Sequence, residues 1–206
     1  MKQYFDQSPD CESHPQIMEI DFQNHRFRFK TDSGVFSKNE LDDGTNILLN
    51  SLQDIHGRVL DLGCGWGAIG IIVAKLFQDT SVLMCDINER AVALAQKNIR
   101  MNGIDRAEVI QSDGFTSVEG SFDVILTNPP IRAGKQVIYG FFAEAAKRLN
   151  PYGRLILVIR KQQGAESAVK YLNTIFQTVR LLEKKKGFWI IQCEGGLNDA
   201  NGSDVF

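Results

Sequence analysis

The chain has 206 residues, of which 43% are hydrophobic and 23% are charged, and its formal net charge is −2 at pH 7. This length suits one domain of ordinary globular composition. The nearly neutral charge excludes a general basic field, so a nucleic acid would have to be held by local patches.

The cysteines are scattered and form no CxxC pair, which argues against a zinc site and against a disulfide framework. They are Cys11, Cys64, Cys85 and Cys193. No apolar run approaches the roughly 18 residues that a membrane-spanning helix needs. The N-terminal stretch MKQYFDQSPDCESHP lacks the apolar core of a secretory signal. We therefore expect a cytoplasmic protein with reduced thiols, no metal and no membrane contact.

Residues 1–30 are expected to form a flexible lead and an N-terminal β-hairpin that turns at Gln23-Asn24. In the second half of this hairpin, Phe27 and Phe29 alternate with Arg26, Arg28 and Lys30. A period of two places the rings on one face and the cations on the other.

After a predicted helix at 41–52, segments with strand and helix patterns alternate along the chain. We expect strands at 59–62, 81–88, 107–113, 122–130 and 154–161, helices at 69–77, 89–103, 137–151 and 166–176, and a closing hairpin at 178–194 that turns near 185–187. This order predicts an α/β domain at 31–194 with a doubly wound, mostly parallel sheet of seven strands. The closing hairpin requires one antiparallel strand, and the polar tail at 195–206 is expected to be disordered.

The first strand of the predicted sheet leads into a glycine-rich loop, DLGCGWGAIG. Gly63, Gly65 and Gly67 would let the backbone approach a ligand where Cβ atoms would collide. The loop also fits the pattern GxGxx(G/A), which by itself would suit the pyrophosphate of a dinucleotide.

Three carboxylates at strand ends favour a different ligand. Asp61 precedes the loop, where it would repel a pyrophosphate but could accept hydrogen bonds from an ammonium group. Asp86 ends the second strand, where it can accept both hydroxyls of a ribose. Asp113 ends the third strand, in a place suited to the amino group of adenine. A ligand with these groups and no phosphate is S-adenosylmethionine.

Five motifs together resemble the class I S-adenosylmethionine-dependent methyltransferases, in particular the small-domain branch related to the guanine-N2 enzyme of small-subunit ribosomal RNA. They are DSGVFSKNELDDGT, VLDLGCGWGAIG, DINERAV, SDGF and TNPPIRAGK. The resemblance implies a Rossmann-like methyltransferase fold with S-adenosylmethionine as cofactor. It adds Ile87, Gly114 and Asn128 to the cofactor-binding residues, together with Phe36 from a segment that closes over the methionine end of the cofactor. Ser37, Leu41, Asp42 and Thr45 match the same segment.

The motif Asn128-Pro129-Pro130-Ile131 follows the fourth strand, and the resemblance implies that it holds a planar amine. The Asn128 side-chain oxygen and the Pro129 carbonyl would each accept one N–H of the amine. The two prolines fix the backbone and so keep the acceptors in place. Many relatives carry an aromatic residue where this chain has Ile131, which can pack on a base but stacks less well.

Four cations follow the fourth and fifth strands: Arg132, Lys135, Arg160 and Lys161. Ligands of open α/β sheets bind outside the carboxyl ends of the strands, so these cations should share an edge with the glycine loop and contact phosphates that flank a target nucleotide. The run Lys184 to Lys186 is expected in a hairpin turn away from that edge.

These residues predict an N-methyltransferase that acts on the exocyclic N2 of guanine in small-subunit ribosomal RNA. Two targets with a similar planar nitrogen stay open, adenine N6 and the side-chain amide of a protein glutamine. A non-enzymatic RNA-binding module on the same fold is a further alternative, although Asp61 and Asp86 speak against it. A dinucleotide oxidoreductase is disfavoured by Asp61 and by the proline motif.

Overall fold

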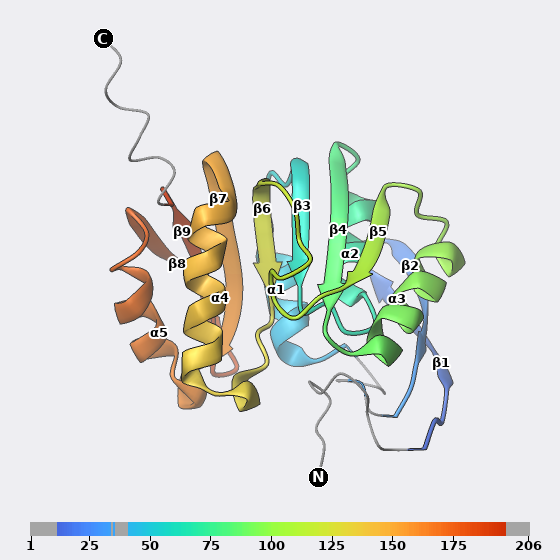
Figure 1. Cartoon of the computed structure of the whole chain (residues 1–206). Coiled ribbons are helices and arrows are strands. Elements are labelled where there is room, and N and C mark those ends of the chain that lie inside the picture. The colour runs from blue at the N-terminus through green and yellow to red at the C-terminus, as the bar shows by residue number, and fades with distance from the viewer. Residues whose placement is uncertain (1–11, 34, 36–40, 197–206) are drawn as a thin grey trace.

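The computed structural model describes residues 12–33, 35 and 41–196, which form a seven-stranded sheet covered by helices and a separate two-stranded hairpin (Figure 1). The sheet has the strand order β5-β4-β3-β6-β7-β9-β8. Its strands are β3 (Gly57–Leu62), β4 (Thr80–Asp86), β5 (Ala107–Gln111), β6 (Phe122–Thr127), β7 (Leu149–Arg160), β8 (Thr178–Lys185) and β9 (Phe188–Glu194).

Neighbouring strands from β5 to β7 are parallel, and only β9 runs antiparallel to both of its neighbours. The predicted fold class, with seven strands, one of them antiparallel, is therefore confirmed. Because all the other strands point the same way, the loops that leave β3, β4, β5, β6 and β7 meet at one edge of the sheet, the lower edge in Figure 1.

Each face of the sheet has its own hydrophobic core. Successive side chains of a strand point to opposite faces, so Val59 and Val124 belong to one core while Leu60 and Ile125 belong to the other. The first core includes residues of α1 (Asp43–Ser51), α2 (Ala68–Leu76) and α3 (Glu89–Met101), and the second includes residues of α4 (Lys135–Arg148) and α5 (Ala165–Leu172). Among the described residues, no helix is long and apolar enough to cross a membrane.

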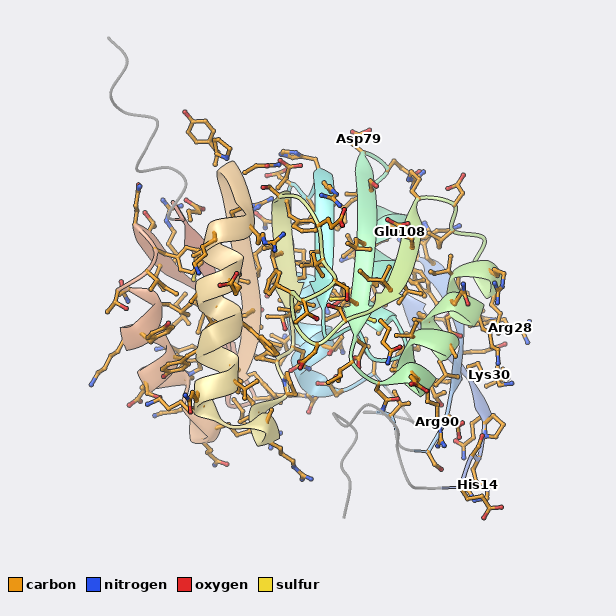
Figure 2. All side chains as sticks on the ribbon, in the orientation of Figure 1. His14, Arg28, Lys30, Asp79, Arg90 and Glu108 are labelled. Carbon is orange, nitrogen blue, oxygen red and sulfur yellow. The ribbon has the colours of Figure 1, made fainter. Side chains whose placement is uncertain are left out.

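The predicted N-terminal hairpin consists of β1 (Gln16–Phe22) and β2 (His25–Thr31). Gln23 and Asn24 form its turn with φ of 45° and 63°, the left-handed values that tight hairpin turns require. Phe27 and Phe29 are buried as the alternation predicts. The backbone of β2 is bound by Asn98 of α3 and by Asn102, the C-cap of that helix, so that Arg28 and Lys30 lie beside the helix (Figure 2).

The predicted helix at 137–151 is wrong at both ends, since α4 begins at Lys135 and ends at Arg148. The chain enters β7 at Leu149, which pairs with Phe122, and an irregularity follows before the regular register resumes at Arg154. Gly153 fits this irregularity because a Cβ there would lie 2.9 Å from the Phe122 carbonyl oxygen. Pro151 therefore lies within the irregular start of a strand.

Candidate functional site

A cavity opens at the edge of the sheet where the parallel strands end. Its wall includes most of the predicted cofactor residues and part of the proline motif: Gly63, Gly65, Asp86, Ile87, Asp113, Gly114, Asn128, Pro129 and Pro130. Asp61, Gly67, Ile131 and the four predicted phosphate-binding cations are not part of this wall. Phe36 lies outside the described residues.

The glycine loop is held against the end of β4 by backbone hydrogen bonds. The N–H groups of Gly63 and Cys64 both donate to the Cys85 carbonyl at 2.9 Å, and the Gly65 N–H donates to the Asp86 side chain at 2.8 Å. Gly67 has a φ of 91°, and a Cβ there would lie 3.2 Å from that of Ala95. The loop is therefore a fixed concave surface whose conformation depends on glycine.

Asp86 braces this loop with both of its carboxylate oxygens. Oδ2 accepts the Gly65 N–H at 2.8 Å, and Oδ1 accepts the Asn88 N–H at 2.9 Å. Burial raises the pKa of Asp86, and the backbone hydrogen bonds partly offset that effect. Each carboxylate oxygen has a second lone pair, so Asp86 can brace the loop and still accept hydroxyl groups from the cavity.

Asp61 lies behind the cavity wall and is fully buried. Its Oδ2 accepts the Gly70 N–H of α2 at 2.8 Å, whereas its buried Oδ1 has no hydrogen-bond partner among the described residues. Burial raises the pKa of Asp61 to about 7. The hydrogen bond from Gly70 lowers this pKa, and the nearby negative charge of Asp86 raises it further. A buried carboxylate with an unpaired oxygen favours a nearby cation.

We expect Asp61→Asn to remove a pH dependence of folding stability. The folded-state pKa of about 7 lies well above 3.8, the ordinary pKa of an aspartate side chain. Ionisation of Asp61 therefore opposes folding, and stability should fall as the pH rises from about 4 through 7. Between pH 5 and pH 8 the asparagine variant should gain about 2–3 kcal/mol relative to the native protein. Urea unfolding of both proteins at the two pH values measures this gain, and parallel pH profiles would contradict the assignment.

The side-chain orientation of Asn128 is set by two acceptors from α1 and its N-cap. Asn128 Nδ2 donates to Asp42 Oδ1 at 3.3 Å and to Thr45 Oγ1 at 3.1 Å. No described residue donates to the Asn128 side-chain oxygen or to the Pro129 carbonyl, whereas the Pro130 carbonyl accepts the Ala133 N–H at 2.8 Å. Pro129 is buried but lines the cavity. The motif thus has two acceptors available for a ligand.

The four predicted phosphate-binding cations are exposed and lie at the ends of β6 and β7, the same edge of the sheet as the glycine loop. Lys135 Nζ lies 5.1 Å from the centre of the Tyr139 ring, and Lys161 Nζ lies 3.8 Å from Glu166 Oε1. The Arg160 guanidinium lies 4.6 Å from the centre of the Phe188 ring. Exposed pairs of this kind are weak, so these cations remain accessible to a polyanion.

The expectation that the lysine run at 184–186 lies away from this edge is wrong. Because β9 runs antiparallel to β7, the turn between β8 and β9 comes to the carboxyl end of β7. The Gly187 carbonyl accepts the Lys161 N–H at 2.8 Å, and Lys186 Nζ lies 2.7 Å from Asp43 Oδ1 at the start of α1. The turn therefore adjoins the cations that follow β7.

Two residues of the cavity wall, Cys85 and Phe141, lie outside the sequence motifs. Cys64 and Ser112 also line the cavity, from within the glycine loop and the SDGF motif. Phe141 reaches it from the middle of α4 and packs on Gly114, where a Cβ would lie 2.4 Å from the Phe141 ring. Burial raises the pKa of the Cys85 thiol to about 12, so this thiol remains protonated and serves as wall. An apolar residue on a helix is indistinguishable from core in the sequence.

The fold and the site agree with comparisons to known proteins. The family model "Methyltransferase small domain" matches residues 26–192. The chain is 43% identical over 195 residues to the uncharacterized protein YbxB of Bacillus subtilis (strain 168), with 93% of this chain and 97% of that protein covered. It is also 43% identical over 130 residues to the ribosomal RNA small subunit methyltransferase C of Pasteurella multocida (strain Pm70), which covers 61% of this chain and 39% of that protein.

Among solved structures, the chain resembles the 16S rRNA N2 G1207 methyltransferase of T. thermophilus in complex with AdoMet and guanosine. The TM-score is 0.79 and the sequence identity is 26%, over 91% of this chain and 52% of that chain. This chain therefore spans about half the length of the T. thermophilus protein and less than half the length of the Pasteurella multocida relative.

The cavity fits S-adenosylmethionine in the chemistry of its residues. The glycine loop offers a concave backbone surface, Asp86 offers acceptors for ribose hydroxyls, and the unpaired oxygen of Asp61 provides negative charge for a cationic ligand. The methyltransferase family model matches most of the chain, and the site offers a carboxylate rather than a pyrophosphate-binding group beside the loop. The alternative of a dinucleotide oxidoreductase therefore has no support. The chain belongs to the methyltransferase small domain family and is an S-adenosylmethionine-dependent methyltransferase.

Proposed function

We propose that this methyltransferase modifies the exocyclic N2 of guanine in small-subunit ribosomal RNA. The observation that carries the proposal is the pair of acceptors in the proline motif. The Asn128 amide nitrogen is occupied by Asp42 and Thr45, and this leaves its oxygen beside the Pro129 carbonyl for an amine with two N–H groups. Two relatives named as small-subunit ribosomal RNA methyltransferases support the choice of substrate, one of them solved with guanosine.

The proposed mechanism relies on positioning rather than on a strong base, because the nitrogen is cationic once it is methylated and then readily loses one of its protons. The lone pair of the guanine amino group is delocalised into the ring, so the amine is a weak nucleophile until it is oriented. Asn128 and Pro129 would accept its two N–H groups and direct the nitrogen toward the cofactor. S-adenosylmethionine, when bound, supplies an electrophilic methyl group. A well-held geometry of this kind can contribute roughly 7–11 kcal/mol to lowering the barrier.

In this proposal the cofactor contacts Asp86, Ile87, Asp113, Gly114 and the glycine loop, and Asp61 provides charge from behind the wall. Ile131 would pack on the target base. Arg132, Lys135, Arg160 and Lys161 would contact the phosphates on either side of the target nucleotide, which gives affinity without base specificity. Phe36 is proposed to close over the methionine end of the cofactor.

Mass spectrometry of nucleosides tests the substrate. Small-subunit ribosomal RNA from a strain that lacks the gene should lose N2-methylguanosine, and the native gene should restore it where Asn128→Ala does not. Loss of N6-methyladenosine instead would move the target to adenine. Intact RNA together with an unmethylated glutamine in a release factor would move it to a protein amide.

A further inference from the structure

Asp42 has a contact that a helix cap does not need. It is the N-cap of α1, and its Oδ1 accepts the Thr45 N–H at 3.1 Å, as N-cap residues commonly do. The same oxygen also accepts from Asn128 Nδ2 at 3.3 Å, across 86 residues of sequence. Thr45, which is itself buried, supplies the second acceptor for the same nitrogen at 3.1 Å.

The contact with Asp42 fixes which end of the Asn128 amide faces the cavity. A primary amide has a donor end and an acceptor end of nearly equal size. A carboxylate can only accept, so a flipped amide would place its oxygen against Asp42 and lose that hydrogen bond, whereas the Thr45 hydroxyl could donate to the oxygen instead. Leaving such partners unsatisfied costs about 1–3 kcal/mol. Asp42 therefore opposes the orientation in which Asn128 would present a donor, and such an orientation could not bind an amine.

The position of Asp42 is fixed by packing at the start of α1. Gly44 lies against Phe188 of β9, and a Cβ at Gly44 would lie 2.9 Å from the Phe188 ring. The Arg160 guanidinium lies over the Phe188 ring, 4.6 Å from its centre. Because α1 approaches the sheet this closely, the carboxylate that caps the helix reaches Asn128 at the end of β6. The capping contact and the contact with Asn128 therefore come from the same side chain.

We propose that Asp42, assisted by Thr45, is a positioning residue that orients the Asn128 amide for the amine substrate. The inference rests on the proposed role of Asn128 and adds a specific source for its orientation. Asp42 acts through Asn128, and its effect on turnover therefore requires Asn128 to be present. Asp42 acts through an oxygen that accepts a hydrogen bond, so the presence of an acceptor oxygen at this position matters more than the negative charge.

A double-mutant cycle in single-turnover methylation of small ribosomal subunits from the deletion strain tests the proposal. Asp42→Ser keeps a hydroxyl that caps α1 but is too short for Asn128, and it should slow methyl transfer by about tenfold or more. In the Asn128→Ala background the same change should have an effect of less than about twofold. Affinity for S-adenosylmethionine, measured by calorimetry, should stay within about threefold in each variant.

Three companion variants sharpen the test. Asp42→Asn keeps a carbonyl acceptor and should retain turnover within about threefold of the native protein, whereas a role for the charge would make it as slow as Asp42→Ser. Thr45→Val removes the second acceptor at constant size and should also slow transfer. Asp43→Ser removes the adjacent acid, which pairs with Lys186 rather than Asn128, and serves as the matched control.

The outcomes separate this inference from the proposed function. If Asn128→Ala slows transfer and Asp42→Ser slows it further by the same factor in both backgrounds, Asp42 acts independently and the inference is overturned. If Asn128→Ala has no effect on transfer, the proposed role of the proline motif fails, and the positioning role of Asp42 fails with it.

Discussion

Asn128→Ala is expected to slow methyl transfer by about 10²–10³-fold, the usual effect of removing one preorganised polar group from an active site. The variant loses the side-chain oxygen that is proposed to hold one N–H of the amine, while the Pro129 carbonyl remains. The glycine loop and Asp86 are unchanged, so affinity for S-adenosylmethionine should stay within about threefold of the native value. Single-turnover methylation and calorimetry measure the two quantities separately.

Asn173→Ala provides a matched control, because Asn173 is exposed at the end of α5 and, within the part of the chain that the structure describes, its side chain donates only to the Val169 carbonyl. It should methylate at the native rate. A rate for Asn128→Ala within about threefold of the native protein would remove the proline motif from the mechanism.

The second large effect is expected for Asp86→Ala, which should weaken S-adenosylmethionine binding by about 100-fold or more. Hydrogen bonds to a charged group contribute roughly 1.5–3 kcal/mol each, and 1.4 kcal/mol is tenfold in affinity. The variant would lose the proposed contacts to two ribose hydroxyls. It would also release the Gly65 N–H, which Asp86 now holds at 2.8 Å. Calorimetry with S-adenosylmethionine measures the change in affinity.

Asp79 supplies the control for this variant. It is an exposed acid that immediately precedes β4, at the upper end of that strand in Figure 2. Asp86 is the last residue of β4, so the two acids lie at opposite ends of the strand. Asp79→Ala should bind the cofactor normally. Thermal unfolding of both variants separates a binding defect from a folding defect. A dissociation constant within about threefold for a folded Asp86→Ala protein would exclude Asp86 as a ribose ligand.

Much of the candidate site follows from the order of elements in the sequence. Alternating strands and helices imply parallel strands, and the carboxyl ends of parallel strands share one edge. For this reason the sequence predicts the glycine loop, Asp86, Asp113 and Asn128 at one place, and Gly63 and Gly65 of the loop share one cavity wall with these three residues. The same rule places the turn at Lys186 at this edge, because β9 runs antiparallel to β7 and begins opposite the end of β7.

Side-chain partners from distant elements could not be predicted in this way. The cap of α1 is a local signal, but its second contact with Asn128 depends on how closely α1 packs on β9 at Gly44. Likewise, Phe141 resembles any apolar residue of a helix until the packing of α4 brings it onto Gly114. Asp61 was expected at the ligand, whereas the structure puts it behind the wall with one oxygen unpaired.

Periodicity and strand direction are properties of local segments and of their order, so the fold, the shared edge and the residue types that meet there follow from the sequence. Which polar groups are already paired, and which remain available to a ligand, depends on the folded domain. Hydrogen bonds between side chains depend on separations of a few ångströms between elements far apart in the chain, and these separations are set by packing of the whole domain.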